Sequence, residues 1–493
     1  HIKKIFLSLF TLVFIVSCNE VSQSPNIVIL IADDVSWDDL GCYGNKFVKT
    51  PHIDQLAKNG ILFENTYLTT SSCSPSRNSI MTGRYPHNTG AAELHTEPPI
   101  KMISFAEILK ENGYYTLSAG KFHMGDYAKR GFNEVQDKRP INGQGGEKYW
   151  LTALENRPKD KPFFMWFASY DAHRVWGDNI FSGSNPIDKV NVPEYLVDLP
   201  ATRKDLADYY DEITRFDHYV GKVVKKLKSD NVFDNTLIIV MADNGRPFPH
   251  SKTRLNNQGV KTPFVVSFPN KMKFKGTQST ALISAIDIAP TIIDIAGIDL
   301  TENFQGKSFK KILSNPKKHF RNYVFAEHNW HDYEAHQRMV SDGKFMYIVN
   351  NRSQFPQTGP LDAINSPTYQ DLKDALENGS ITQKQNEIFV NPRNNEEFYN
   401  LTLDPFQFNN LLSSGTSEEY IHLKKVLNQW MDETGDDVPE SLTKDYYLRD
   451  QEKGVENSSL KTDFYQTRGI MPGFKSNAII INNKGPFWKD PLF

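Results

Sequence analysis

Cysteine is scarce in this chain, whose 493 residues include only Cys18, Cys42 and Cys73. So few cysteines cannot form a disulfide framework, and a chain of this length can bury a large apolar core instead. In an exported protein, Cys42 and Cys73 could still be joined by a disulfide. If Cys73 has a chemical role, Cys42 is a lone packed thiol.

An excess of positive charge is also missing, because the net charge is −3. The protein therefore has no basic field of the kind that binds nucleic acid, and an anionic ligand must be held by a local cluster of cations. The sequence shows no internal repeats and no low-complexity tract. With 39% hydrophobic and 23% charged residues, its composition is that of an ordinary soluble globular protein.

No hydrophobic run is long enough to span a membrane comfortably. The run Ile5–Val16 follows two lysines and has the length of the apolar part of a signal peptide. It ends at Ser17 and Cys18 in a pattern that resembles the bacterial lipobox. That resemblance implies a lipoprotein signal peptide over residues 1–18 and lipidation of Cys18. The protein would then be exported to the periplasm or the cell surface and touch the membrane only through its lipid. A plain secretory signal is the alternative.

Strands and helices alternate through the first part of the chain. Asn26–Ala32 and Thr236–Ala242 are continuous apolar runs typical of buried parallel strands, and Lys204–Lys228 has apolar side chains at helical spacing. Further strands are expected at Tyr114–Ala119, Phe163–Ser169 and Pro263–Phe268, and further helices at Ile53–Lys58, Ser104–Gly113 and Ala285–Ala296. The alternation predicts an α/β fold over residues 24–320, with a large, mostly parallel sheet flanked by helices.

From about residue 320 the pattern changes to short strands separated by loops. The expected elements are strands at Tyr323–Glu327, Arg338–Ser341, Phe345–Val349 and Glu397–Leu401 and a helix at Glu418–Thr434. Residues 321–493 are therefore predicted to form a smaller C-terminal α+β subdomain with an antiparallel sheet, followed by a tail. Within the tail, Ala478–Ile481 and Phe487–Trp488 could pack back onto the body.

Polar side chains directly follow several predicted strands. They are Asp33, Asp34, Lys121, His123, His173, Asp243 and Asn244. Because ligands bind at the carboxyl edge of open α/β sheets, we expect these side chains to lie together. The acidic and amide side chains are hard oxygen ligands suited to Ca²⁺ or Mg²⁺. The lysine and histidines, with Arg77 and Lys252, could hold an anion and exchange protons. Taken singly, each residue would be an ordinary turn, cap or structural residue.

The stretch Cys73–Arg77 reads C-S-P-S-R and has the features of a helix start. Pro75 fits a first helical turn, and the small polar residues before it suit an N-cap. A helix N-terminus attracts anions, and Arg77 adds a permanent cation. These residues alone are equally compatible with a nucleophile at an anion site and with a buried structural cysteine.

The chain resembles the type I sulfatases of the alkaline-phosphatase superfamily. Cys73–Arg77 with Thr82–Arg84 matches the signature C-x-P-S-R followed by T-G-R, and Gly120–Gly125 is similar to the second signature, G-K-W-H-L-G, with Phe122 in place of tryptophan. The resemblance extends to Asn26–Asp34, Asp243–Gly245, Phe398–Leu401 and Asp404–Pro405. Within the family it is nearest to the heparan N-sulfoglucosamine sulfohydrolase branch, through Asp243–Pro249, Tyr170–Arg174 and Ser366–Leu372.

This resemblance implies a formylglycine made from Cys73 by a maturation enzyme, and a bound Ca²⁺, with Mg²⁺ as the lesser candidate. The implied metal ligands are Asp33, Asp34, Asp243, Asn244 and residue 73. Arg77 would orient the formylglycine hydrate, and Lys121 and Lys252 would bind the sulfate. His123 would act as the base for collapse of the sulfated intermediate, and His173 as the acid on the leaving group. Lys252 departs from the branch, which carries arginine there.

The substrate implied is a sulfated carbohydrate, either a heparan-type glycosaminoglycan or an algal polysaccharide such as ulvan or carrageenan. Candidate sugar-contacting residues are His250, Arg254, His328, Trp330, His331 and Arg338. Taken singly, each of them is better explained as an ordinary loop residue. One alternative is a phosphoesterase or phosphonate hydrolase of the same superfamily, although a phosphatase would usually present serine or threonine at position 73. Another is a non-catalytic glycan-binding lipoprotein, which would have no reason to keep the complete set of metal, base and nucleophile positions.

Overall fold

The computed structural model describes residues 24–300, 303–449, 455–458 and 468–486. The predicted signal peptide, Cys18 and Phe487–Trp488 lie outside these residues. Within the described ranges, no helix combines the length and the apolar character that crossing a membrane requires.

Eight strands of the described chain form a mixed sheet in the order β4-β3-β5-β1-β6-β7-β2-β8. All neighbouring pairs are parallel except those that involve β7, which runs antiparallel to both β6 and β2. The strands are β1 (Asn26–Ala32), β2 (Ile61–Tyr67), β3 (Tyr115–Gly120), β4 (Glu134–Gln136), β5 (Phe163–Ala168), β6 (Thr236–Ala242), β7 (Phe264–Ser267) and β8 (Thr277–Ser284). The prediction of a mostly parallel sheet is confirmed.

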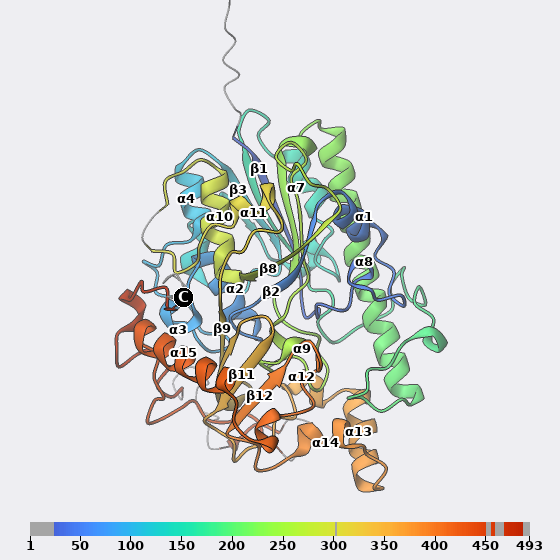
Figure 1. Cartoon of the computed structure of the whole chain (residues 1–493). Coiled ribbons are helices and arrows are strands. Elements are labelled where there is room, and N and C mark those ends of the chain that lie inside the picture. The colour runs from blue at the N-terminus through green and yellow to red at the C-terminus, as the bar shows by residue number, and fades with distance from the viewer. Residues whose placement is uncertain (1–23, 301–302, 450–454, 459–467, 487–493) are drawn as a thin grey trace, which may run out of the picture.

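Helices cover both faces of this sheet (Figure 1). The α-helices are α1 (Pro51–Asn59), α2 (Cys73–Thr82), α3 (Pro86–Thr89), α4 (Phe105–Glu111), α5 (Asp126–Lys129), α6 (Arg139–Asn142), α7 (Trp150–Asn156), α8 (Pro200–Ser229), α9 (Asn257–Val260), α10 (Ile288–Ile295), α11 (Lys310–Ser314), α12 (Leu361–Ile364), α13 (Pro367–Glu377), α14 (Gln383–Asn386) and α15 (Glu418–Thr434). Because side chains alternate along a strand, Ile27, Ile29 and Ile31 of β1 pack with α4 and α10, whereas Val28 and Leu30 pack with α1 and α8. Strand β1 is thus apolar on both faces, as its sequence predicts.

A second sheet of four antiparallel strands, in the order β12-β11-β10-β9, lies in the C-terminal part of the chain, as predicted. Its strands are β9 (Val324–His331), β10 (Tyr333–Ser341), β11 (Phe345–Asn350) and β12 (Glu396–Asn400). Helix α15 packs on this sheet through Leu427 and Trp430. The helix begins where the Ser417 side chain accepts a hydrogen bond from the Tyr420 N–H, and ends at Gly435, which is left-handed. A domain boundary near residue 320 stays a prediction.

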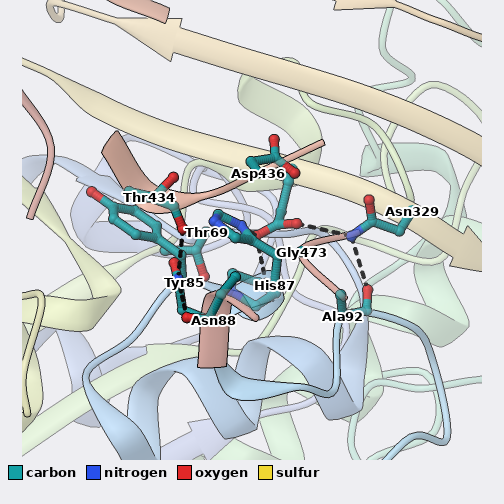
Figure 2. Close-up of polar contacts among 12 residues, drawn as sticks. Thr69, Tyr85, His87, Asn88, Ala92, Asn329, Thr434, Asp436 and Gly473 are labelled. Atoms are coloured by element: carbon teal, nitrogen blue, oxygen red, sulfur yellow. Dashed lines mark hydrogen bonds and ion pairs between the residues drawn. The ribbon is translucent and has the colours of Figure 1, made fainter. Parts of the chain in front are cut away.

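A buried ionic network joins β9 and β10 to the segment after helix α2. Figure 2 shows the part of it around His87, Asn329 and Asp436. His87 Nδ1 lies 2.8 Å from Glu327 Oε1, and Arg338 pairs with Asp436 through two hydrogen bonds and with Glu327 at 3.7 Å. Asn329 donates to Glu327 and to the Ala92 carbonyl. His87, Glu327 and Asp436 are close enough to surround a metal ion, but Arg338 already pairs with both carboxylates and His87 with Glu327. We therefore interpret this cluster as a structural contact between helix α3 and the second sheet.

We predict that Arg338→Ala lowers the free energy of unfolding by about 3–5 kcal/mol, because it leaves the buried Asp436 and Glu327 without their cation. Arg130→Ala is the matched control, since the Arg130–Glu107 pair is partly exposed and should be worth about 1 kcal/mol or less. Urea unfolding measures both values. Equal losses in the two variants would contradict the structural role given to Arg338.

The pKa of His87 also makes stability depend on pH. Burial alone would lower this pKa, but Glu327 and Asp436 outweigh burial and raise it. The stabilisation is therefore fully present below the unfolded pKa of about 6.5 and is lost as pH rises through the raised folded value. We expect the free energy of unfolding to fall above about pH 6.5. In His87→Gln, this part of the pH dependence should be missing from unfolding curves collected across pH 6–9. An unchanged pH dependence in the variant would refute the assignment.

Candidate active site

Four neighbouring parallel strands bring the predicted site residues to one edge of the sheet. Strands β3, β5, β1 and β6 are consecutive in the sheet, and each ends just before a predicted residue or pair. Lys121 and His123 follow β3, His173 follows β5, Asp33 and Asp34 follow β1, and Asp243 and Asn244 follow β6. The structure therefore brings together the set that the strand pattern predicted.

The backbone at this edge is tightly constrained. Gly120 has a φ of +97°, and a Cβ there would lie 1.8 Å from the Ala168 carbonyl oxygen of the neighbouring strand, so only glycine fits. Asp34 and His123 also have positive φ values, 60° and 46°, which non-glycine residues seldom adopt. Such conformations persist where surrounding contacts hold them, and they are frequent at functional sites.

Cys73 is the first residue of α2, and its side chain is buried. Pro75 lies in the first turn, as predicted, and Ser72 occupies the N-cap position. The Ser72 side chain makes no cap hydrogen bond; its hydroxyl lies 2.9 Å from His331 Nδ1. Cys73 Sγ is 3.8 Å from one carboxylate oxygen each of Asp33 and Asp34. Cys42 and Cys73 are both free, so the structure contains no disulfide between them.

Each buried carboxylate at the site is paired with a cation from a different element. Lys121 Nζ lies 2.5 Å from Asp33, Arg77 Nε 2.8 Å from Asp243, and Lys252 Nζ 2.7 Å from Asp34. Lys252, which does not directly follow a predicted strand, therefore lies in the cluster as well.

Burial and neighbouring charges together shift the pKa values of Asp33 and Asp243 in opposite directions. Burial opposes ionisation of Asp33, but Lys121, His173 and Arg77 outweigh it and lower its pKa well below the usual range. Burial together with neighbouring Asp33 raises the pKa of Asp243 to about 7, despite its ion pair with Arg77. Burial also raises the pKa of the Cys73 thiol well above its usual range.

The donor set fits a hard divalent cation. The carboxylate oxygens of Asp33 and Asp34 and the sulfur of Cys73 lie within 4.8 Å of one another. Asn244 Nδ2 donates to Asp34 Oδ1 at 2.5 Å, while the buried Asn244 Oδ1 has no hydrogen-bond partner in the described chain. A buried carbonyl oxygen without a donor, beside several carboxylates, is a ready ligand for such a cation.

Four histidines line the cavity that opens at Cys73, which has a volume of about 580 Å³. They are His95, His331 and the two residues predicted as acid and base, His123 and His173. His173 Nε2 lies 3.9 Å from Asp34 and 3.6 Å from Asp362. His123 Nε2 lies 2.9 Å from His95 Nδ1, and burial lowers the pKa of both rings in this pair, that of His95 to about 4. Both imidazoles of the pair are thus held neutral.

Among the cavity residues that sequence reasoning missed, Asp362 and His95 contact predicted site residues directly. Asp362, on α12, accepts a hydrogen bond from Lys252 at 2.8 Å and so brings the C-terminal part of the chain into the site. It lies four residues before the run Ser366–Leu372, and that proximity was the one available signal. His95 carries no such signal, because it lies in an irregular segment between α3 and α4.

Of the six candidate sugar-contacting residues, only His331 is among those that line the cavity. The other five lie outside that lining. His250 and Arg254 both bind Glu387, and Arg338 binds Asp436. His328 is buried, and Trp330 packs beside Leu94 and donates to the Lys444 carbonyl. Sugar contact by these five stays a prediction from the sequence.

Comparison with known families identifies the protein class. Residues 25–298 match the family Sulfatase, and residues 250–350 match the family "N-sulphoglucosamine sulphohydrolase, C-terminal". The first match covers more than half of the chain. The chain therefore belongs to the sulfatase family and is a sulfuric ester hydrolase, and the resemblance to the N-sulfoglucosamine sulfohydrolase branch is confirmed.

Curated relatives cover most of the chain. An ulvan-active sulfatase of Formosa agariphila is 31% identical over 86% of this chain and 83% of its own length. The human N-sulphoglucosamine sulphohydrolase is 29% identical over 84% of this chain and 91% of its own length.

Solved structures confirm the fold. One is a protein solved in complex with its substrate D-glucosamine-2-N,6-O-disulfate. It has a TM-score of 0.67 and 19% identity and covers 83% of this chain and 98% of its own. Another, Ps i-CgsB in complex with k-i-k-neocarrahexaose, has a TM-score of 0.63 and 20% identity and covers 92% of this chain and all of its own.

Proposed function

We propose that this sulfatase removes sulfate groups from a sulfated polysaccharide or oligosaccharide, with a formylglycine made from Cys73 as nucleophile and Ca²⁺ as cofactor. The observation that carries the proposal is the position of Cys73. It lies at a helix N-terminus, 3.8 Å from Asp33 and Asp34, at the base of a cavity bordered by Lys121 and two histidines. The maturation enzyme is the one additional protein that this mechanism requires.

The surrounding cations are arranged to bind a sulfate. Lys121 and Lys252 pair with neighbouring aspartates, Asp33 and Asp34, and both can point a charged N–H at a sulfate oxygen. Arg77 is fully buried and held by Asp243 and Asp33, so it can orient residue 73 without moving itself. Positive groups fixed in this way stabilise charge that develops on the sulfate during transfer.

The two histidines have separate roles. His173 lies on the side of Asp362 and Lys252, where it can protonate the oxygen or nitrogen of the leaving sugar. His123 is neutral and can accept the proton that is released at residue 73. As a hydrated aldehyde, residue 73 would supply one hydroxyl for attack on sulfur and a second one for release of sulfate by C–O cleavage.

Asp33, Asp34, Asp243, Asn244 and residue 73 would hold the Ca²⁺. A divalent cation there would polarise a sulfate oxygen. Oxygen ligands of this kind suit Ca²⁺ and, less well, Mg²⁺.

Ulvan and heparan-type glycosaminoglycans are the favoured substrates, because the relatives include an ulvan-active sulfatase and an N-sulphoglucosamine sulphohydrolase. Carrageenan stays a third candidate. The phosphoesterase and non-catalytic alternatives find no support among these relatives. Export as a lipoprotein anchored at Cys18, in the periplasm or at the cell surface, stays a prediction from the sequence.

Mass spectrometry of the peptide that contains position 73 tests the nucleophile. In protein from a host with the maturation enzyme, we expect an aldehyde in place of the thiol. Cys73→Ala should lose about a thousandfold or more of sulfate release from ulvan, heparan and carrageenan oligosaccharides, without loss of thermal stability. The control Cys42→Ala should keep its activity. An unmodified Cys73 in a fully active enzyme would rule out the mechanism.

Ca²⁺ should raise the melting temperature, because it binds only the folded site. Asn244→Ala removes one ligand and should weaken Ca²⁺ affinity by about 10–100-fold in a calorimetric titration. The exposed Asn315→Ala is the control and should bind like the wild type. Equal affinity in Asn244→Ala and the control would exclude Asn244 as a ligand.

A further inference from the structure

His95 contacts His123, the proposed base, directly. Its Nδ1 atom lies 2.9 Å from His123 Nε2, and the two ring centroids are 5.0 Å apart. Both rings line the cavity at Cys73. In many catalytic sites the base is itself oriented by a third group that makes a hydrogen bond to its second nitrogen. His95 has the position of such a third group.

His95 is fixed relative to helix α2, which carries Cys73. Its backbone N–H donates to Ser74 Oγ at 2.8 Å, and its φ of 62° is left-handed. The preceding residue, Leu94, donates its N–H to the Trp330 carbonyl at 3.1 Å and belongs to the same apolar cluster as Cys73. A left-handed conformation of a non-glycine residue persists where surrounding contacts hold it, so the ring has a defined place beside His123.

The contact with His95 occupies one of the two ring nitrogens of His123. Nε2 faces His95, and the buried Nδ1 has no hydrogen-bond partner among the residues that the structure describes. Nδ1 is therefore the nitrogen that is left for residue 73. Burial, together with the charge of Lys121, holds the pKa of His123 well below its usual range, so the ring is neutral. A neutral ring can accept a proton at Nδ1 only if its own proton lies on Nε2.

Two pairs of neutral tautomers can form this hydrogen bond. In the first pair, His123 Nε2–H donates to His95 Nδ1, and His123 Nδ1 keeps its lone pair. In the second pair, His95 Nδ1–H donates to His123 Nε2, and the proton on His123 Nδ1 is buried without an acceptor in the described chain. A buried N–H without an acceptor destabilises the folded protein, whereas a lone pair there can accept a hydrogen bond from a hydroxyl of residue 73. The first pair is therefore favoured.

We propose that His95 is a positioning residue, which holds His123 in the tautomer with the proton on Nε2 and the lone pair on Nδ1. The proposal rests on the proposed function, in which His123 accepts a proton during release of sulfate from residue 73. His123 Nδ1 takes the proton of the free hydroxyl, the oxygen of that hydroxyl becomes the aldehyde oxygen, and the C–O bond to sulfate breaks with its electron pair leaving on sulfate. His95 itself gains no proton in this step.

Nitrogen NMR of isotope-labelled histidines tests the tautomer without any turnover. In wild-type protein with an unmodified Cys73, the spectrum should show the His123 proton on Nε2, with His123→Gln used to assign the signals. His95→Ala removes the acceptor, so the His123 signals should move toward a mixture of both tautomers. His95→Asn should keep the wild-type pattern, because asparagine Oδ1 replaces Nδ1 as acceptor and asparagine tolerates a left-handed φ.

Kinetics separate this role from substrate binding. On an activated aryl sulfate, His95→Ala should lower kcat by about 10–100-fold and lower KM with it, because release of sulfate from residue 73 becomes the slow step. The value of kcat/KM should stay within about threefold, since it reports only the steps up to sulfate transfer. Sulfated residue 73 should then accumulate during turnover and be detected by mass spectrometry of the quenched enzyme. His95→Asn should recover most of kcat.

His319→Ala is the matched control. His319 is exposed, lies outside the cavity lining and has a comparable ring contact, with Nε2 2.7 Å from Asn322 Oδ1. Its removal should change neither the His123 signals nor kcat. Melting temperatures show whether each variant is folded, and His95→Asn keeps the test decisive if His95→Ala is unstable.

Two outcomes would overturn the proposal. One is a His123 proton on Nδ1 in the wild type. The other is a higher KM with unchanged kcat in His95→Ala, which would mean that His95 contacts the sugar instead. Failure of the proposed function is distinguishable, because the wild type with a modified residue 73 would then release no sulfate, whereas the tautomer of His123 could still be read from the spectra.

Discussion

Three carboxylates held inside the protein determine how the catalytic edge is built. Asp33, Asp34 and Asp243 are buried, and isolated buried charges would cost several kcal/mol each. Each is offset by a cation from another part of the chain: Lys121 after β3, Lys252 after β6, and Arg77 on α2. These three ion pairs form only if the strands have this order and α2 lies beside them. Next to these ion pairs, Asn244 Oδ1 has no donor among the residues that the structure describes and is a ready ligand for a cation.

The C-terminal part of the chain completes this edge from the other side. Asp362 on α12 binds Lys252, and His331 at the end of β9 contacts Ser72 at the start of α2. The network of His87, Glu327 and Arg338 holds β9 against the segment after α2. Cavity shape thus depends on how accurately the N-terminal and C-terminal parts of the chain dock, although the residues proposed to react all come from the N-terminal part.

Local patterns predicted the elements that are determined locally. The bounds of β1, β6 and α15 agree with the sequence prediction, because continuous apolar runs and caps define them. The antiparallel direction of β7 was not foreseen, since an apolar run does not reveal its direction. Strands β2 and β8 were missed because polar residues such as Glu64 and Gln278 interrupt their apolar pattern. Pairing between distant parts of the chain could not be predicted either. Arg338 was a candidate to contact a sugar, but it pairs with Asp436, 98 residues later in the chain.

The contacts of Arg84 have a consequence for the order of events during synthesis. This residue follows α2 closely, yet its guanidinium binds the carbonyls of Ile479 and Ile481, 395 and 397 residues later. Ribosomes synthesise the chain from the N-terminus at about 5–20 residues per second. Arg84 is therefore made tens of seconds before Ile479 and Ile481, whose carbonyls it binds. Cys73 is buried only once the surrounding elements have assembled, and any enzyme that must reach its side chain has that interval in which to act.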